Sequence, residues 1–464
     1  MRSIRIALAL SLVAVLMPAA IVAAPAAAQE AGPPERREVD ELKAEVRALR
    51  DQVSALQRQL DALMKGEAAA APAVPPAVAT TPLAAPPAAP MPAAAPTPPP
   101  ATGPARAPSL MNPAISAVFQ LIGNTAIGGR EDADGFDLSE AEIAFESTVD
   151  PYAKMNLYLS FPADESPEIE EGYATTFALP ASLQLKGGRF KSAFGKWNGL
   201  HTHAFPTIER PDALVNFFGE ESLANDGLSL SWLIPNPAGV YVDSTTEVGT
   251  AREGTSFNSA ARALTWTEHL AFFFNAGDND TVEMGATAAG GQTGPTETLL
   301  ADLDANGLTG TLVPDERLRS AVYGVDVTWK WKPLQQNTYR SFLWQTEALL
   351  SRRRAQTLDP ALFLDETTIA SAGGYSYLEG QWTRRWKLGL RYDLSGFPDS
   401  ATDREWGAAY VVKFVPSEFQ ELRFQVKYTR FNESAAQRFG VDEDDTRLLL
   451  EWIPVIGAHG AHEY

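Results

Sequence analysis

The stretches VDVTWKW at residues 325–331 and LRFQVKYT at residues 422–429 alternate apolar and polar residues at every position. Successive side chains of a β-strand point to opposite faces of a sheet, so each stretch has one apolar and one polar face. The apolar faces are rich in aromatic residues, whereas the polar faces carry lysine and arginine. This combination predicts strands that face lipid on one side and water on the other.

Similar strands recur from residue 110 to the C-terminus and predict an all-β fold, an antiparallel transmembrane β-barrel of about 16 strands. Short turns that contain proline alternate with long polar connections, which is the asymmetry of outer-membrane barrels. A soluble β-sandwich is the alternative, because its strands alternate in the same way. The expected strands lie near residues 114–124, 137–149, 152–161, 170–179, 182–190, 227–233, 239–247, 260–272, 281–288, 320–331, 341–353, 374–385, 387–395, 404–415, 420–430 and 444–456.

The composition limits the possible functions. All 10 tryptophans, 12 tyrosines and 22 phenylalanines follow residue 118, so a core or an aromatic belt can form only in the barrel region. There is no cysteine, which excludes disulfides and thiolate metal sites. The net charge of −20 argues against a nucleic-acid partner, because proteins that bind nucleic acids carry basic patches.

The N-terminus predicts export. Arg2 and Arg5 precede an apolar run over residues 6–24 and then Ala26-Ala27-Ala28, which is typical of a secretory signal peptide at residues 1–28. No later stretch is continuously apolar for about 18 residues, so a spanning helix is not expected. We therefore expect a barrel in the outer membrane of a Gram-negative-type bacterium, with the lipids of that membrane as a partner.

A short N-terminal segment, residues 29–38, leads into a predicted coiled coil at residues 39–65. Valine and leucine recur there at spacings of three and four residues, at Val39, Leu42, Val46, Leu49, Val53, Leu56, Leu60 and Leu63. Valine at three a positions and leucine at the fourth, with leucine at every d position, favours two strands. We nevertheless expect a trimer, on the family resemblance described below. An amphipathic helix on a surface is the alternative, although its apolar stripe is normally wider.

Residues 66–109 contain 14 prolines and are otherwise largely alanine and threonine. Such a sequence has too little apolar bulk to fold, so it predicts an extended Ala/Pro-rich linker. We expect the coil and the linker to lie in the periplasm, where the coil is placed to contact the cell wall.

Charged side chains on the faces opposite the aromatic residues are expected to line a water-filled lumen. The basic candidates are Lys330, Arg391, Lys413, Arg423, Lys427 and Arg447, and the acidic ones are Asp326, Glu347, Glu379, Asp393 and Glu451. A wall with charges of both signs favours a hydrated pore with a field across it. The alternative is that these charges only hydrate the lumen and set no strong selectivity.

One connection differs from the others. Residues 191–226 mix apolar, basic and acidic residues instead of being uniformly polar, so we expect them to fold into the lumen as a constriction loop. The charges available to line the constriction are Arg189, Lys191, Lys196, Arg210, Glu220 and Glu221. This loop is therefore the predicted determinant of what passes.

The block GRFKSAFG at residues 188–195 resembles the G-x-F-K-P-P-F-G block of the phosphate-selective porin family of Gram-negative outer membranes. The stretches at residues 323–326 and 344–347 and the C-terminal GAHGAH at residues 457–462 resemble a branch of porin-like barrels with names linked to zinc regulation. The resemblance covers residues 110–464 and implies a trimeric channel of 16 strands that is general or prefers anions. Ser192-Ala193 stand where the family has paired prolines.

Four histidines form two closely spaced pairs, His201 with His203 and His459 with His462. Two imidazoles at such spacings can bind a divalent cation such as zinc, with a nearby carboxylate completing the site. The alternative is that they are polar residues of a loop and of the C-terminal tail.

The sequence contains no hydrolase, zinc-protease or nucleotide-binding motif, so neither an enzymatic activity nor a cofactor is expected. An energy-coupled receptor needs an N-terminal plug domain, and the coil and linker occupy that position. The sequence therefore predicts a passive, trimeric porin for small hydrophilic solutes or ions. The alternatives are a zinc-related uptake channel and a structural tether of the envelope.

Overall fold

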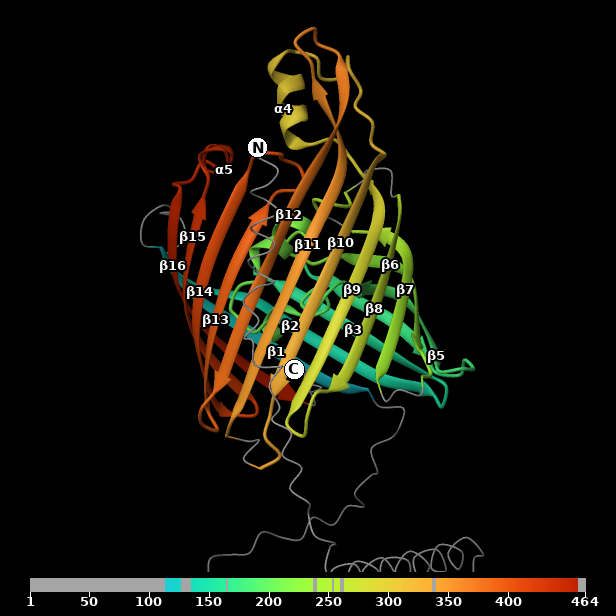
Figure 1. Ribbon diagram of the computed structural model, residues 1–464, viewed down its shortest axis with the longest axis vertical. Coiled ribbons are helices and arrows are strands. Elements are labelled where there is room, and N and C mark those ends of the chain that lie inside the picture. Colours follow the sequence, from blue (N-terminus) through green and yellow to red (C-terminus); the bar gives the residue numbers. More distant parts are fainter. Residues whose placement is uncertain are drawn as a thin grey trace, which may run out of the picture. The chain divides into compact units, whose positions relative to one another are not determined.

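The computed structural model describes residues 113–126, 135–163, 166–236, 240–252, 254–258, 263–335 and 339–457. These residues belong to one compact unit (Figure 1). The predicted signal peptide, coiled coil and linker lie outside the described residues, as do His459 and His462. The roles expected of them stay predictions.

The described strands form a closed antiparallel barrel of 16, in which each strand pairs with its neighbours in the sequence. This confirms the predicted fold class and the predicted number of strands. The strands are β1 Ala114–Ala126, β2 Gly135–Asp150, β3 Ala153–Pro162, β4 Glu168–Thr176, β5 Leu183–Lys191, β6 Ala224–Leu233, β7 Tyr241–Ala251, β8 Leu264–Asn275, β9 Asp280–Thr293, β10 Leu318–Trp331, β11 Ser341–Leu358, β12 Leu364–Gln381, β13 Trp386–Gly396, β14 Arg404–Ser417, β15 Gln420–Phe431 and β16 Asp444–Gly457.

The first and last strands close the barrel. β1 pairs with β16 along a seam that joins residues 116–126 to residues 447–457. Within the seam, the side-chain amide of Gln120 donates a hydrogen bond of 2.5 Å to the carboxylate of Glu451. Because the sheet closes on itself, every strand has partners on both sides and no edge is left open.

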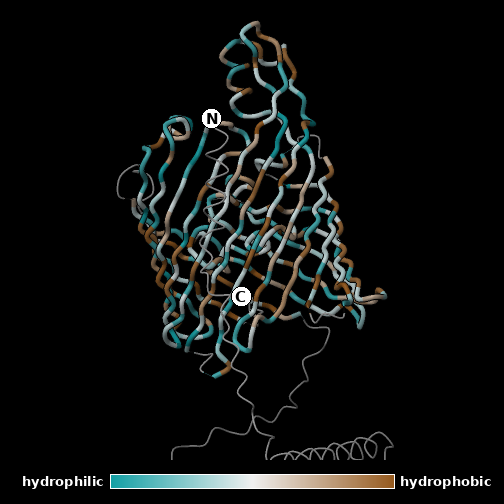
Figure 2. The backbone as a smooth tube through the Cα atoms, in the orientation of Figure 1, coloured by the Kyte–Doolittle hydropathy of each residue, from teal (hydrophilic) through white to brown (hydrophobic). Residues whose placement is uncertain are grey.

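The alternation in the sequence corresponds to the two faces of the wall. In β10, Asp326 is 2% exposed whereas Val325 before it is 58% exposed. In β15, Arg423 is 2% exposed whereas Phe424 after it is 42% exposed. Hydrophobic residues run along the strands of the wall in Figure 2. Polar side chains therefore face the interior and apolar ones face outward, which is what a lipid-facing barrel requires.

The hairpin of β11 and β12 is longer than the sequence predicts. A polar connection is expected over residues 354–373, but the two strands pair as far as Leu358 opposite Leu364. The added part carries polar side chains, such as Arg354 and Glu366, which form an ion pair of 2.8 Å. It rises above the barrel rim beside α4 (Figure 1). A strand without an apolar face gives no alternation signal, so the sequence pattern missed it.

In the part of the chain that the structure describes, four helices lie in the long connections. The β5–β6 connection contains η2 Thr202–Ala204 and α3 Asp212–Phe218, the β9–β10 connection contains α4 Glu297–Ala305, and the β15–β16 connection contains α5 Glu433–Phe439. No helix in the described part of the chain is both long and apolar enough to cross a membrane. The connections at the other end are short, as between β2 and β3 or β14 and β15.

Candidate functional site

The connection between β5 and β6, residues 192–223, lies inside the barrel and is termed the inner segment (Figure 1, green). On one side, the Ala193 N–H donates a hydrogen bond of 3.2 Å to Glu247 of β7. On another side, the Ile208 N–H donates one of 2.9 Å to Gln425 of β15. Because β7 and β15 are far apart in the strand order, the inner segment spans the lumen.

Five buried aromatic side chains fix the inner segment to the wall and are termed the aromatic anchor: Phe194, Trp197, Phe205, Phe217 and Phe218. The centroid of the Trp197 ring is 5.3 Å from that of Tyr375 and 5.9 Å from that of Tyr377, both in β12. The Trp197 indole N–H donates a hydrogen bond of 2.6 Å to Gln345 of β11. Burying one such side chain stabilises the fold by about 1.5–3 kcal/mol, so the anchor is a substantial apolar core.

Gly195 allows the inner segment to approach β11. Its φ is +57°, and a Cβ atom at this position would overlap the carboxylate of Glu347. The same carboxylate accepts a hydrogen bond of 3.3 Å from the Lys196 N–H. Both the backbone conformation and the close contact therefore require glycine here.

A buried ion pair holds the second half of the inner segment to the barrel wall. Lys427 of β15 forms a buried ion pair with Asp212, the first residue of α3. Burial disfavours the ionised form of Asp212, but the charges of Lys427 and Arg391 outweigh it and lower the pKa of this carboxyl. The pair therefore persists as ions inside the barrel.

The charges predicted to line the lumen face inward, but most of them contact protein instead of open water. Arg391 donates hydrogen bonds to the Thr207 hydroxyl and the Glu209 carbonyl, and Arg423 donates one of 3.1 Å to the His203 carbonyl. The buried members are Arg391, Lys413, Arg423, Lys427, Asp326, Glu347, Asp393 and Glu451. Those that remain partly exposed are Lys330, Glu379 and Arg447.

Three of the charges predicted for the constriction hold the inner segment in place. The ammonium of Lys191 donates a hydrogen bond of 2.9 Å to the Leu200 carbonyl of the inner segment and lies 2.7 Å from a carboxylate oxygen of Glu170. Lys196 forms an ion pair with Glu283 of β9. Arg210 is buried and donates hydrogen bonds of 2.8 Å to the Gly219 carbonyl and 2.9 Å to the Asn198 side chain, which tie two parts of the inner segment together. Its burial lowers its pKa to about 10. These residues therefore serve to fix the loop, and only Lys196 keeps part of its charge accessible.

Arg189 lies on the outer face of the barrel, where its guanidinium is 2.7 Å from the carboxylate of Asp226 in β6. Phe190, the next residue, is completely buried on the inner face. This position does not fit a role in the constriction. The basic block in the sequence does not show which of its residues face inward, because the strand ends within it.

Glu220 and Glu221 follow α3 and are exposed on the surface of the inner segment. They are still enclosed by the barrel, and this enclosure raises the pKa of both carboxyls. The neighbouring charges of Glu168 and Glu170 act in the same direction on Glu221, whose pKa is about 7. Of the predicted constriction charges, these two are the most accessible to solutes.

Three glutamates surround His201, and the four residues are termed the carboxylate cluster. His201 Nδ1 lies 2.8 Å from Glu142 of β2 and 3.0 Å from Glu170 of β4, and Nε2 lies 3.0 Å from Glu171. All four side chains are buried. Burial and the charge of Lys191 oppose protonation of His201, but Glu170 and Glu142 outweigh them and raise the pKa of the imidazole well above its usual value.

A β-bulge allows two consecutive glutamates of β4 to reach the same histidine. Tyr158 of β3 pairs with Glu171 and the next residue, Leu159, pairs with Ile169, so Glu170 is the extra residue. Regular alternation would send Glu170 and Glu171 to opposite faces. The bulge turns both carboxylates inward.

The predicted histidine pair is only partly brought together. The rings of His201 and His203 are 5.8 Å apart between centroids, and His203 Nδ1 is 3.7 Å from Glu142. The potential metal ligands that lie closest are instead Glu142, Glu170 and His201, whose ligand atoms are all within 4.8 Å of one another. His459 and His462 lie outside the described residues.

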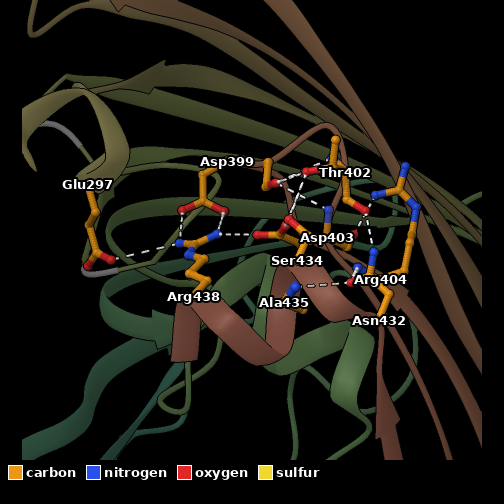
Figure 3. A network of polar contacts seen from close by, with 10 residues as sticks. Glu297, Asp399, Thr402, Asp403, Arg404, Asn432, Ser434, Ala435 and Arg438 are labelled. Atoms are coloured by element: carbon orange, nitrogen blue, oxygen red, sulfur yellow. Dashed lines mark hydrogen bonds and ion pairs between the residues drawn. The ribbon is translucent and has the colours of Figure 1, made fainter. Parts of the chain in front are cut away.

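At the mouth of the barrel, Arg438 of α5 connects three of the long connections (Figure 3). Its guanidinium lies 2.6 Å from Asp399 and 3.3 Å from Asp403, both between β13 and β14, and 3.8 Å from Glu297 of α4. Hydrogen bonding to Asp399 raises the pKa of Arg438 above the usual value of an arginine. The loops around the mouth are therefore tied to one another.

Comparisons with known proteins find one sequence relative and several structures of similar fold, but they do not assign the chain to a family. No family model matches the sequence. An uncharacterized protein of Aquifex aeolicus (strain VF5) is 26% identical over 369 residues, which are 75% of this chain and 74% of that protein. The outer membrane channel DcaP of Acinetobacter baumannii is 9% identical over 74% of this chain and 97% of that chain, with a TM-score of 0.46. The anion-selective porin from Comamonas acidovorans is 9% identical over 74% of this chain and 100% of that chain, also with a TM-score of 0.46. The resemblance to phosphate-selective porins stays a prediction.

Two groups at the site were missed from the sequence. One is the aromatic anchor, whose residues are spread over the inner segment without a regular period. The other is the set of glutamates around His201, because β2 and β4 are brought together only by the barrel. The run EIEE at residues 168–171 is a signal that could have been used, since three acids in four residues break the alternation of a strand.

Proposed function

We propose that the protein is an outer-membrane porin, a passive water-filled channel for small hydrophilic solutes or ions. The observation that carries this proposal is the inner segment across the lumen of a closed barrel that is apolar outside and polar inside. Such a barrel can cross a bilayer without an unpaired strand edge. A fixed segment in its lumen limits the size of the solutes that pass.

The outer face of β7 and β8 supports assembly with other copies of the chain, for which we propose a homotrimer. Glu268 lies on the same face as the exposed Trp266, and it accepts hydrogen bonds of 2.8 Å from Ser244 and 2.5 Å from Thr246. A carboxylate in the middle of a lipid-facing surface is costly, so this face is better suited to contact with another copy. Light scattering on the detergent-solubilised protein tests this proposal, and a monomeric mass would contradict it.

The accessible charges favour cations over anions. Lys196 is paired with Glu283 and Arg447 is paired with Glu209, so these positive charges are balanced by the nearby wall or loop. Glu220 and Glu221 are the more exposed charges on the inner segment. We therefore propose a weak preference for cations, in contrast to the anion preference that the family resemblance implies.

Conductance in planar bilayers tests the channel itself. The purified full-length protein is expected to give stepwise current increases, with a reversal potential in a KCl gradient that indicates a preference for K⁺. Protein that inserts without conducting would overturn the proposal. An anion-preferring reversal potential would overturn only the proposed selectivity.

The absence of cysteine makes a local test possible. In Glu221→Cys, a positively charged methanethiosulfonate reagent is expected to shift the reversal potential towards anion preference. A negatively charged reagent, added to a separate unmodified sample, is expected to shift it towards cation preference. Asp226→Cys is the matched control, because Asp226 is an exposed carboxylate on the outer face. Equal responses of the two variants would show that Glu221 does not face the conducting path.

A further inference from the structure

The carboxylate cluster contains more negative than positive charge. Its three glutamates face His201, and Lys191, paired with Glu170, is the one lysine in contact with them among the described residues. Even with His201 protonated, three carboxylates face one ammonium and one imidazolium, so one negative charge of the cluster is unbalanced. Buried charges persist in proteins when they are paired or when they coordinate a metal ion.

Glu142 is the carboxylate of the cluster that has the fewest hydrogen-bond partners within the chain. Its side chain is 2% exposed, and neither carboxylate oxygen accepts a hydrogen bond. One of these oxygens nevertheless lies 2.8 Å from His201 Nδ1, although without hydrogen-bond geometry. By contrast, Glu171 accepts a hydrogen bond of 2.7 Å from the Lys191 N–H in addition to its contact with His201. Glu142 is therefore a buried carboxylate at ion-pair distance from a ring nitrogen but without a well-aligned hydrogen bond.

The orientation of the imidazole strengthens this argument. Both ring nitrogens of His201 lie 3.0 Å from carboxylate oxygens that accept hydrogen bonds, so each nitrogen carries a hydrogen. A metal ion that displaces the Nδ1 proton would meet a lone pair there, while Nε2–H still donates to Glu171. That lone pair faces the carboxylates of Glu142 and Glu170, which are also electron-pair donors. Three donors that converge on one point are arranged for a cation.

We propose that Glu142, Glu170 and His201 bind a divalent transition-metal ion such as Zn²⁺. Their ligand atoms lie within 4.8 Å of one another, which leaves room for an ion at about 2.0–2.2 Å from each. Imidazole nitrogen together with carboxylate oxygen suits zinc and its neighbours, whereas calcium and magnesium prefer oxygen ligands alone. Glu171 on the far side of the ring supplies the carboxylate that commonly orients a metal-binding histidine.

The ion would connect three parts of the molecule. Glu142 belongs to β2, Glu170 to the bulge of β4 and His201 to the inner segment. Binding therefore clamps the inner segment to the wall opposite the aromatic anchor. This inference goes beyond the proposed function and does not depend on conduction, because binding is measured on solubilised protein without a bilayer.

Zinc binding to the full-length, chelator-treated protein is the test. Calorimetry and metal analysis are expected to give one tight Zn²⁺ per protomer. In Glu142→Gln and His201→Gln, the affinity of this site is expected to fall by more than about tenfold. A wild-type protein without a saturable site, or a site that keeps its affinity in both variants, would overturn the proposal.

Glu247→Gln is the matched control. Glu247 is completely buried on the inner face of β7 and contacts the inner segment through Ala193, but it forms no ion pair with a histidine of the described residues. This variant is expected to bind Zn²⁺ as the wild type does. A loss of affinity in this control equal to that in Glu142→Gln would show a general effect of buried charge and would overturn the assignment.

A second measurement avoids variants that fail to fold. X-ray absorption on the zinc-loaded wild-type protein is expected to show one imidazole nitrogen and otherwise oxygen ligands. Two or more imidazoles would place the ion elsewhere, at His203 or at the histidines of the C-terminal tail, and would overturn the assignment. An environment of oxygen alone would overturn it as well.

Discussion

The inner segment is attached to the barrel at two places that differ in their physical nature. The aromatic anchor packs Trp197 and its neighbours against β10 to β14, where hydrophobic burial provides the stability. The carboxylate cluster instead holds His201 among glutamates of β2 and β4, where charges must be balanced. The anchor is complete within the chain, whereas the cluster lacks positive charge.

This difference indicates which attachment can be regulated. Apolar packing has no ligand to gain or lose under ordinary conditions, so the aromatic anchor is a permanent contact. A charged cluster changes its strength with each cation that it gains or loses. We therefore expect the side of the inner segment near β2 and β4 to respond to its surroundings and the side near β10 to β14 to stay fixed.

The largest effect is expected from removing the centre of the aromatic anchor. Trp197→Ala should destabilise the barrel by about 3–5 kcal/mol, because it leaves a cavity among buried rings. Chemical unfolding in detergent measures this loss. Trp382→Ala is the control, because Trp382 is 69% exposed and its removal should cost little. Equal losses in the two variants would contradict the comparison.

A smaller effect is expected from the buried ion pair on the same side. Lys427→Met leaves Asp212 without its nearest cation and should cost about 3 kcal/mol. Adding Asp212→Asn should recover much of this loss, because the unpaired charge is then gone. A double-mutant cycle with no coupling energy would show that the pair does not hold α3.

Zinc is expected to stabilise the protein by a similar or slightly smaller amount. At a free concentration about 100 times the Kd, binding to the folded state contributes about 2.7 kcal/mol. Because the two attachments are separate, the same gain should appear in Trp197→Ala. If zinc stabilises the wild type but not Trp197→Ala, the two attachments are coupled and the comparison fails.

The smallest effect concerns pH and the exposed end of the inner segment. Glu221 has a pKa of about 7, and the charged groups that act on it are Glu168, Glu170 and Lys191. Below this pH the carboxyl is neutral and above it the carboxylate is negative, so cation preference should increase from pH 6 to pH 8. Reversal potentials measure the change. Glu221→Gln should remove the step, and an unchanged step would assign it to another group.

The barrel could be predicted from the sequence because alternation is a local signal. Residues 325–331 and 422–429 each show their two faces without reference to the rest of the chain. The β11–β12 hairpin was predicted too short for the complementary reason, since polar side chains such as Arg354 and Glu366 mark no apolar face.

The carboxylate cluster could be predicted only in part. His201 was visible as a candidate ligand, but its partners depend on pairing between strands and on the bulge at Glu170. A bulge changes the direction of side chains without a clear mark in the sequence. The contacts of Arg391 and Lys427 were hidden for a similar reason: the sequence shows that they face inward but not what occupies the interior.

The seam between β1 and β16 has a consequence for biogenesis. The inner segment precedes β6 in the chain, but many of the residues that enclose it, such as Tyr377, Arg391 and Lys427, are synthesised much later. They surround it only when the last strand meets the first, where Gln120 contacts Glu451. The inner segment must therefore lie inside the nascent barrel before β1 and β16 pair. Pairing of these two strands then also encloses the inner segment in its final position.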